Sequence, residues 1–366
     1  MSSTPYKPSD FYKPQRRWKG LVSALLCILA ALIVLALVLF FALGKYVVVT
    51  PERLYLALPG SDYEDLTTAE ETPVYTPSVT AEIVVDQTDF SSISAVAGED
   101  LSAVNAVYLK AEDVTEANLT ALTGKVSEHE ANAVMLQLKA SDGQLMWAST
   151  VSMAVSYGAT GTLDLTSYIS SWKESGLYLI AQLSCCTDEL MATRYPALAL
   201  KNADGTAYHD DYGYWLDPYN RTVREYIVDL AKELSEMGFD EIVFSELRHP
   251  AAEGLTYTQA MTASPDPKSA VDSFSLRLHR AFEGSDTRLS VRCDAASVRT
   301  DLSAQTGEDL DFYLKVFDRL YCNTTAADAA SDQALAVEHI SGENRSHRFV
   351  AVASETAGID SWVLTD

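Results

Sequence analysis

Aromatic and acidic side chains are concentrated in residues 208–219, which read YHDDYGYWLDPY. Aromatic rings can stack on the apolar face of a sugar, because they offer a flat apolar surface. Carboxylates accept hydrogen bonds from the sugar hydroxyl groups. The pattern therefore favours a carbohydrate site, with Trp215 and Asp217 as substrate-binding candidates. A loop that folds on its own aromatic rings would give the same pattern.

Further polar side chains stand at the ends of short apolar runs that are typical of strands. The carboxyl ends of parallel strands meet at one edge, where ligands bind, so these side chains would surround one site. Asp294 shares a strand face with Arg292, and an ion pair is its expected use. The substrate-binding candidates at these ends are Gln137, Lys139, Gln182, Asp188, Ser245, Arg248, Arg292 and Asp294.

Two glutamates at the ends of predicted strands are the catalytic candidates, because a carboxyl group can act as a general acid. Glu246 follows Ser245 directly, and successive strand side chains point to opposite faces. If Ser245 faces the site, Glu246 points away from it, unless a bulge or turn begins there. Glu355 shares a strand face with Ala351 and Ala353. A salt bridge from Glu355 to an arginine is an equally good interpretation.

The sequence lacks the motifs of several other kinds of catalytic site. The six histidines show no His-Glu-x-x-His spacing for zinc, and the chain has no Gly-x-Ser-x-Gly nucleophile motif or glycine-rich phosphate loop. We therefore expect no metal ion and no cofactor. The formal net charge of −24 opposes nucleic-acid binding, which requires a basic face.

The elements that must position these residues alternate between strand and helix after residue 100. Such alternation predicts a parallel sheet. Eight units over about 260 residues match a (β/α)8 TIM-like barrel of the α/β class. A doubly wound open sheet is the alternative. The predicted strands are 106–109, 133–138, 177–183, 241–244, 289–293, 319–322, 349–353 and 362–364. The predicted helices are 115–129, 164–174, 221–237, 267–283, 307–317 and 327–339.

The strongest single element is the helix predicted over 221–237. Its apolar residues recur at helical spacing from Val223 onwards, so they form one stripe. Asn220 can cap the start of this helix, and Gly238 can end it.

A run of 23 residues without a charge extends from Leu21 to Leu43. As a helix it would be about 34 Å long, enough for a hydrocarbon core of about 30 Å. Basic residues precede the run, so the positive-inside rule places the N-terminus in the cytoplasm. A cleaved signal peptide is the alternative, although its apolar region is shorter, about 7–15 residues. We expect a single-pass protein of the plasma membrane with an extracellular C-terminal domain.

The composition divides the chain into four parts. They are a cytoplasmic basic tail at 1–20, a transmembrane helix at 21–44, an extracellular stalk at 45–82 and a barrel domain at 83–366. Proline, threonine and acidic residues make the third part typical of a spacer.

Cysteine usage leaves the disulfide question open. Cys27 lies inside the predicted span, and an exported domain can oxidise the others. Four cysteines allow three pairings, and we interpret them instead as small core residues on strands. These four are Cys185, Cys186, Cys293 and Cys322.

Several sequence words between residues 106 and 250 stand in a distinctive order. They are NAVMLQLK at 132–139 with DG at 142–143, LYLIA at 177–181 with Asp188, YPALA at 195–199, WLDPY at 215–219 after Gly205, and GFDEIVF at 238–244 with Arg248 and Pro250. Together they resemble a family of bacterial glycoside-hydrolase-like TIM-barrel domains. The resemblance implies a barrel that hydrolyses glycosidic bonds with carboxylates, in a protein that is secreted or membrane-anchored.

Three positions depart from the pattern of that family. Gln137 and Ser245 stand where the pattern has aspartate, and Gln182 stands where it has arginine. A serine hydroxyl cannot replace an anionic carboxylate beside a developing oxocarbenium ion. A working hydrolase would therefore need Glu246 or Glu355 to supply the missing carboxylate.

Three alternative functions are compatible with this sequence. The first is a membrane-anchored extracellular glycoside hydrolase that acts on a cell-surface or environmental glycan. The second is a catalytically degenerate barrel that binds carbohydrate or serves as a cell-envelope scaffold. A purely structural domain with a protein partner is the third. For the first two we expect a polysaccharide or cell-wall glycan as partner, the lipid bilayer as a second partner through residues 21–43, and no nucleic acid.

Overall fold

The computed structural model describes residues 47–49, 54–56, 101–257, 266–340, 344–356 and 358–365. The chain divides into two compact units, Met1–Ile83 and Val84–Asp366. In the first unit the described residues form an antiparallel pair of strands, β1 (Val47–Val49) and β2 (Leu54–Leu56). The predicted transmembrane helix, the basic tail, Cys27 and the rest of the predicted stalk lie outside the described residues. None of the helices in the described ranges is long and apolar enough to cross a membrane.

Eight parallel strands of the second unit form a closed barrel. They are β3 (Asn105–Leu109), β4 (Ala133–Lys139), β5 (Tyr178–Ser184), β8 (Glu241–Ser245), β9 (Arg288–Asp294), β10 (Leu320–Asn323), β11 (Phe349–Ala353) and β12 (Trp362–Leu364). All eight predicted strands are therefore present. The pairing of β12 with β3 closes the sheet, which confirms the TIM-like barrel and excludes the open sheet.

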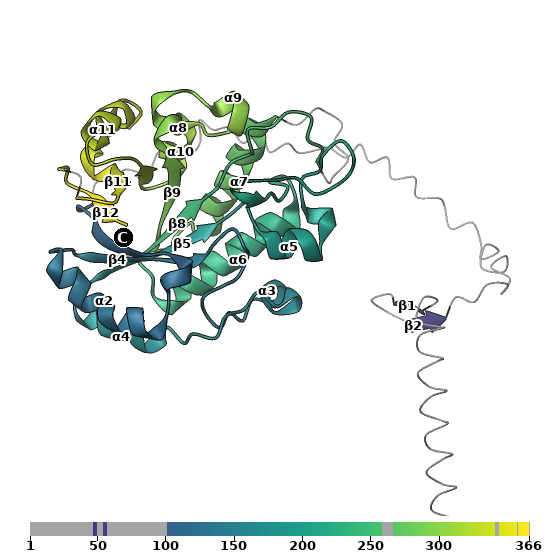
Figure 1. Cartoon of the computed structure of the whole chain (residues 1–366), viewed down its shortest axis with the longest axis horizontal. Coiled ribbons are helices and arrows are strands. Elements are labelled where there is room, and N and C mark those ends of the chain that lie inside the picture. Colours follow the sequence, from purple (N-terminus) through teal and green to yellow (C-terminus); the bar gives the residue numbers. More distant parts are fainter. Residues whose placement is uncertain are drawn as a thin grey trace, which may run out of the picture. The chain divides into compact units, whose positions relative to one another are not determined.

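Helices surround the strands. They are α2 (Glu116–Glu128), α3 (Ser152–Tyr157), α4 (Thr166–Glu174), α5 (Glu189–Arg194), α6 (Arg221–Met237), α7 (Pro267–Ala281), α8 (Ala295–Arg299), α9 (Ser303–Thr306), α10 (Leu310–Val316) and α11 (Ala329–Glu338). In Figure 1, α2 and α4 lie on one side of the strands, and α8, α10 and α11 lie on the opposite side. The six predicted helices are present. The short helices α3, α5, α8 and α9 were not predicted, because they are too short to show a helical period.

Helix α6 has the predicted ends. The Asn220 side chain accepts a hydrogen bond from the Thr222 amide at 2.9 Å, and Gly238 ends the helix with a φ of 108°. Such a positive φ costs a glycine little, because it has no Cβ. Val223 and Leu230 from the predicted apolar stripe are fully buried. The helix is thereby held against the strands and leads into β8.

Two apolar clusters build the barrel domain. The larger one lies between the strands and the helices, and the smaller one fills the barrel interior. The described cysteines of this unit are all free and buried, in agreement with their interpretation as core residues. The interior cluster consists of Val104, Ala106, Tyr108, Ala133, Met135, Ile180, Val243, Tyr321, Val350, Val352 and Val363.

An ion pair closes the end of the barrel where the strands begin. The Arg319 guanidinium donates to the Glu241 carboxylate at 2.5 Å, and both side chains are buried. Tyr178 and Ser290 also donate to Glu241, at 2.9 and 2.5 Å. Because these polar groups satisfy one another, this end of the barrel is tightly packed.

Candidate active site at the carboxyl ends of the strands

The three positions that differ from the family pattern, Gln137, Gln182 and Ser245, lie together inside the barrel. Gln137 on β4 and Gln182 on β5 are register partners, and the Gln182 side-chain amide donates to the Ser245 hydroxyl at 3.0 Å. Gln137 accepts a hydrogen bond from the Ala111 amide at 3.2 Å. We call the ends of these strands the barrel mouth. Its residues are Gln137, Gln182, Ser245, Glu246, Arg292, Asp294 and Asn323.

Arg292 joins the barrel mouth through neutral partners. Its guanidinium donates to the side-chain oxygen of Gln182 at 2.6 Å and to that of Asn323 at 2.8 Å. The guanidinium also lies 5.2 Å from the centre of the Tyr108 ring, within the range of a cation–π contact. The expected ion pair with Asp294 is replaced by a relay, because Asn323 accepts from Arg292 and donates to Asp294 at 2.7 Å.

Glu246 has an unusual backbone conformation. Its φ is 46°, in the left-handed region that residues with a Cβ rarely occupy. The chain therefore turns directly after β8, which is the exception to strict alternation that the sequence analysis named. The Cys186 amide donates to the Glu246 carbonyl at 3.1 Å and holds this turn. Backbone strain of this kind costs roughly 1–3 kcal/mol and is concentrated at functional sites.

The Glu246 side chain lies at the rim of the barrel. It is half-buried, and its negative charge reaches Tyr108 in the barrel interior. Burial raises the pKa of Tyr108, the Glu246 charge adds to this, and the Arg292 guanidinium opposes it. The same charge also reaches the buried Cys185 thiol on the outer side of the strands, whose pKa is raised mainly by burial. Glu246 is thus a carboxylate at the edge of the barrel mouth.

An aromatic and cationic stack lies beside the mouth. The Arg248 guanidinium lies 4.4 Å from the centre of the Tyr212 ring and 5.2 Å from that of Trp215. Trp215 is fully buried, and its indole N–H donates to Asp210 at 2.8 Å, whereas Tyr212 is 44% exposed. The ring that presents a surface for stacking on a sugar is therefore Tyr212 and not the predicted Trp215.

A small hairpin positions Tyr212. Its strands are β6 (His209–Asp210) and β7 (Gly213–Tyr214), which pair antiparallel. Gly213 has a φ of 111°, so the tight turn uses the conformational freedom of glycine. Asp210 accepts a hydrogen bond from the Tyr212 amide at 2.9 Å. The acidic and aromatic residues of this segment thus fold on one another and also carry one exposed ring to the mouth.

Lys139 and Asp188 form a buried pair. The Lys139 ammonium lies 3.1 Å from the Asp188 carboxylate, and neither side chain has exposed surface. The ammonium also donates to the Ser184 and Thr187 carbonyls at 3.0 and 3.1 Å. Asp188 caps α5 by accepting from the Met191 amide at 2.6 Å. These two candidates hold the loop after β5 in place and do not face solvent.

Asp217 and Glu355 also lie apart from the mouth residues. Asp217 is fully buried and accepts a hydrogen bond from the Tyr219 amide at 2.8 Å, which forms a local turn before α6. Glu355 is exposed and lies two residues after the end of β11. Neither side chain joins the network around Arg292.

Glu308 is a carboxyl group that the sequence analysis missed. It is 5% exposed and accepts hydrogen bonds from Ser297 at 2.9 Å and Thr306 at 2.8 Å. Burial raises the pKa of Glu308, while the Arg248 charge opposes the shift and Asp294 adds to it. The loop that carries Glu308 follows β9 and contains only very short helices. Only its place after a strand, among several acidic residues, could have indicated it.

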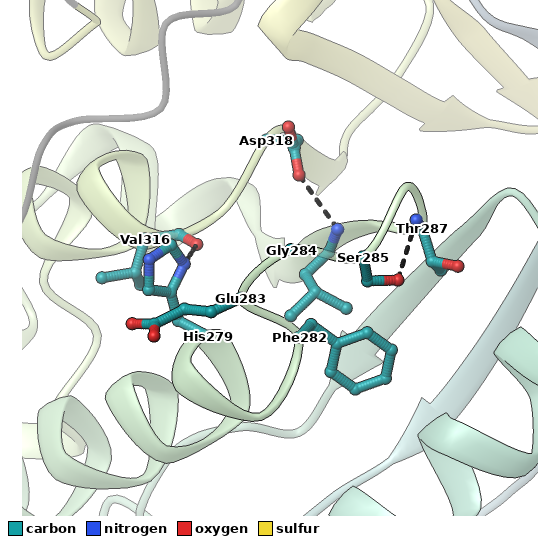
Figure 2. A pocket seen from close by; sticks show the side chains of 9 residues that line it. His279, Phe282, Glu283, Gly284, Ser285, Thr287, Val316 and Asp318 are labelled. Atoms are coloured by element: carbon teal, nitrogen blue, oxygen red, sulfur yellow. Dashed lines mark hydrogen bonds between the residues drawn. The ribbon is translucent and has the colours of Figure 1, made fainter.

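A pocket of about 320 Å³ lies at a different place (Figure 2). Its lining includes His279, Phe282 and Asp318, close to the beginning of β9. The Leu289 amide donates to Asp318 at 3.0 Å, and His279 Nδ1 lies 2.9 Å from the Val316 carbonyl. These polar groups hold backbone in place. Because TIM-barrel sites lie where the strands end, we place the candidate site at the barrel mouth and not here.

The amino-acid sequence of the barrel domain matches a known protein family. Residues 106–318, more than half of the chain, match the family model described as "Putative glycosyl hydrolase domain". The chain belongs to this family. The match runs from β3 to the residues just before β10 and includes every mouth residue except Asn323. It confirms the resemblance found in the sequence. Among curated proteins, none matches the chain.

The solved structures to which the chain is similar include glycosyl hydrolases. A hypothetical protein from Ruminiclostridium thermocellum is 26% identical, over 50% of this chain and 96% of that one, with a TM-score of 0.45. The GH20 exo-β-N-acetylglucosaminidase from Vibrio harveyi is 11% identical, over 70% and 42% of the two chains, with a TM-score of 0.49. The spore cortex-lytic enzyme SleL from Bacillus megaterium is 12% identical, over 69% and 51%, with a TM-score of 0.42. The matched part thus spans about half of the length of these two enzymes.

The barrel has its polar network at the carboxyl ends of the strands, where this fold places active sites. Glu246 and Asp294 are the half-buried carboxylates among the mouth residues. In the described ranges, no three His, Cys, Asp or Glu side chains are grouped as metal ligands. The arrangement offers proton transfer and charge stabilisation by carboxyl groups, which is the chemistry of glycoside hydrolysis.

Proposed function

We propose that the protein hydrolyses glycosidic bonds of a cell-surface or environmental glycan, with Glu246 as its proton donor. The observation that carries this proposal is the left-handed backbone of Glu246 directly after β8. That turn brings a carboxyl group to the edge of the mouth, next to the neutral side chain of Ser245. A strained residue at the end of a barrel strand is the kind of feature that catalysis maintains.

Proton donation is the step that Glu246 would perform. A carboxylic acid protonates the glycosidic oxygen as the bond to the anomeric carbon breaks. The exposed ring of Tyr212 lies beside the mouth and supplies a surface for the sugar. Glu355 is less suited to the task, because it is exposed and outside the network of the mouth.

A carbohydrate-binding barrel without turnover is the second candidate. The uncharged side chains of Gln137 and Ser245 favour it, because they stand where the family pattern has aspartate. Such a barrel would bind a polymer through Tyr212 and the amide groups without cleaving it. Binding without product release, weakened in Tyr212→Ala, is its signature.

We also propose that the barrel is displayed outside the cell by a single membrane span at residues 21–44. The uncharged run and the basic residues before it support this proposal. Protease treatment of intact cells tests it. The proposal predicts that the barrel is removed from intact cells while the tail is protected, and complete protection of the barrel would contradict it.

The enzymatic proposal is tested with the full chain in detergent against polysaccharides and aryl glycosides, by measuring released reducing ends. Wild type should release product, and Glu246→Gln should lower the rate by about 10²–10⁴-fold, the usual contribution of acid–base catalysis. Glu355→Gln and Glu130→Gln should leave the rate unchanged. Glu130 is a matched control, because it is an exposed glutamate that also has a left-handed φ of 52°. Full activity of Glu246→Gln would refute the assigned role.

A further inference from the structure

Asp294 ends β9 on the inner face of the barrel. It shares that face with Ser290 and Arg292, whose side chains both reach interior groups. Strand β9 is the direct neighbour of β8, after which Glu246 follows. Two carboxylates therefore stand at the ends of adjacent strands on one mouth. Asp294 is thus placed to be the second carboxylate that glycoside hydrolysis normally uses.

The hydrogen bonds of Asp294 come from neutral donors. Asn323 donates to one carboxylate oxygen at 2.7 Å, and the Tyr212 hydroxyl donates to the other at 3.2 Å. An ionised carboxylate is an acceptor only, so this donor set suits the charged form. Among the described residues, no lysine or arginine forms an ion pair with Asp294. Its charge is therefore held in place but is not neutralised by a cation in contact.

Other aspartates of the barrel domain show the contrast. Asp188 pairs with Lys139 at 3.1 Å, Asp318 with Arg288 at 3.2 Å, and Asp332 with Arg299 at 2.7 Å. The negative charges of those three aspartates are paired with cations and stabilise the fold. The arginine nearest to Asp294 in sequence, Arg292, is turned towards Gln182 and Asn323 instead.

We propose that Asp294 is the catalytic base that acts with Glu246, and that Tyr212 positions it. This inference rests on the proposed hydrolase function. Glu246 gives its proton to the glycosidic oxygen, the bond from that oxygen to the anomeric carbon breaks, and the leaving group departs as an alcohol. The oxygen of a water molecule bonds to the anomeric carbon, and Asp294 takes the proton that this water loses. One water is consumed for each bond cleaved.

Tyr212 fits the positioning role. Its hydroxyl donates to Asp294, and its ring rests on the Arg248 guanidinium at 4.4 Å. The negative charge of Asp294 raises the pKa of Tyr212, with burial as the second cause. The phenol therefore keeps its proton and stays a donor. Because Tyr212 lies on the hairpin of β6 and β7, that hairpin would set the orientation of the base.

The test separates the two carboxylates by their roles. Two substrates of the sugar that wild type cleaves are compared, its natural glycoside and its 2,4-dinitrophenyl glycoside, whose leaving group needs no proton. Glu246→Gln should lose turnover of the natural glycoside but retain that of the dinitrophenyl glycoside. Asp294→Asn should lose about 10²–10⁴-fold on both, because water must be deprotonated in either reaction. Asp311→Asn, a change of an exposed aspartate, is the control.

Rescue by azide distinguishes the loss of the catalytic base from misfolding of the variant. Azide is an anionic nucleophile and needs no base, so it should restore turnover to Asp294→Ala and yield a glycosyl azide that mass spectrometry detects. Tyr212→Phe should lower kcat about tenfold with KM little changed, since it removes one hydrogen bond to a charged group. A purely structural role of Tyr212 would lower the melting temperature and leave kcat unchanged.

The failure of this inference is distinguishable from the failure of the proposed function. Turnover by wild type together with undiminished turnover by Asp294→Asn would overturn the role of Asp294 and leave the hydrolase intact. A folded Asp294→Ala that azide does not restore would also overturn it. Absence of turnover by wild type on every substrate would overturn both.

Discussion

Strain at Glu246 can be measured by comparing two substitutions at the same position. Glycine and alanine both remove the carboxylate, so the difference between Glu246→Gly and Glu246→Ala reports on the backbone alone. In the left-handed region a residue with a Cβ costs roughly 1–2 kcal/mol. Glycine lowers the free energy of unfolding by about 0.5–1 kcal/mol relative to alanine, because its unfolded chain has greater conformational freedom. We expect the glycine variant to be more stable than the alanine variant by about 0.5–1 kcal/mol.

The assay is thermal unfolding of the full chain in detergent, followed by tryptophan fluorescence. For a domain of this size, 1 kcal/mol corresponds to about 2–4 °C in Tm, so a difference of about 1–4 °C is expected. The same pair of substitutions at Glu130, whose φ is 52°, should give the same sign. At Glu236, an exposed position inside α6, the sign should reverse, because glycine in a helix costs about 1 kcal/mol relative to alanine.

One result would refute the reasoning. If Glu246→Gly is no more stable than Glu246→Ala while the pair at Glu130 behaves as expected, the backbone at Glu246 is not strained. The turn after β8 would then carry no sign of a functional cost. Activity gives a second readout, since both Glu246 variants should lose turnover of the natural glycoside although the glycine variant is the more stable of the two.

Two further predictions concern stability. Glu241→Gln should lower the free energy of unfolding by about 3–5 kcal/mol, because it leaves the buried Arg319 charge without its partner; Glu241→Gln combined with Arg319→Met should recover part of this loss in denaturant titrations. Burial lowers the pKa of His249 in the folded protein below its ordinary value of about 6.5, so the unfolded chain binds the extra proton and stability falls as the pH drops below about 6.5. In His249→Phe this part of the pH dependence should disappear between pH 7 and 5, and denaturation midpoints as steep in pH as those of wild type would contradict the assignment.

The strand–helix framework was predictable because it depends on local patterns. Each barrel strand coincides with an apolar run in the sequence, and α6 has both its predicted cap and its predicted end. The convergence of Gln137, Gln182 and Ser245 followed from parallel strand order alone.

The conformation and exposure of individual site residues were less accessible from sequence. The left-handed φ of Glu246 has no local signal, because glutamate is not a residue that marks such turns. The burial of Trp215 below Arg248 and Tyr212 arises from packing between segments that lie apart in the sequence. Asp294 was expected in an ion pair with Arg292, and only the position of Asn323 between them reveals the relay.

The seam between β12 and β3 has a consequence for synthesis. The Trp362 amide donates to the Val104 carbonyl at 2.8 Å, and the Ser361 hydroxyl accepts from the Val104 amide at 3.1 Å across 257 positions of the chain. Contacts of such high contact order slow folding. While the ribosome is still making the region between them, β3 has an open edge that can pair with another molecule. Until β12 is made, this edge of β3 remains a site through which the incomplete barrel can aggregate.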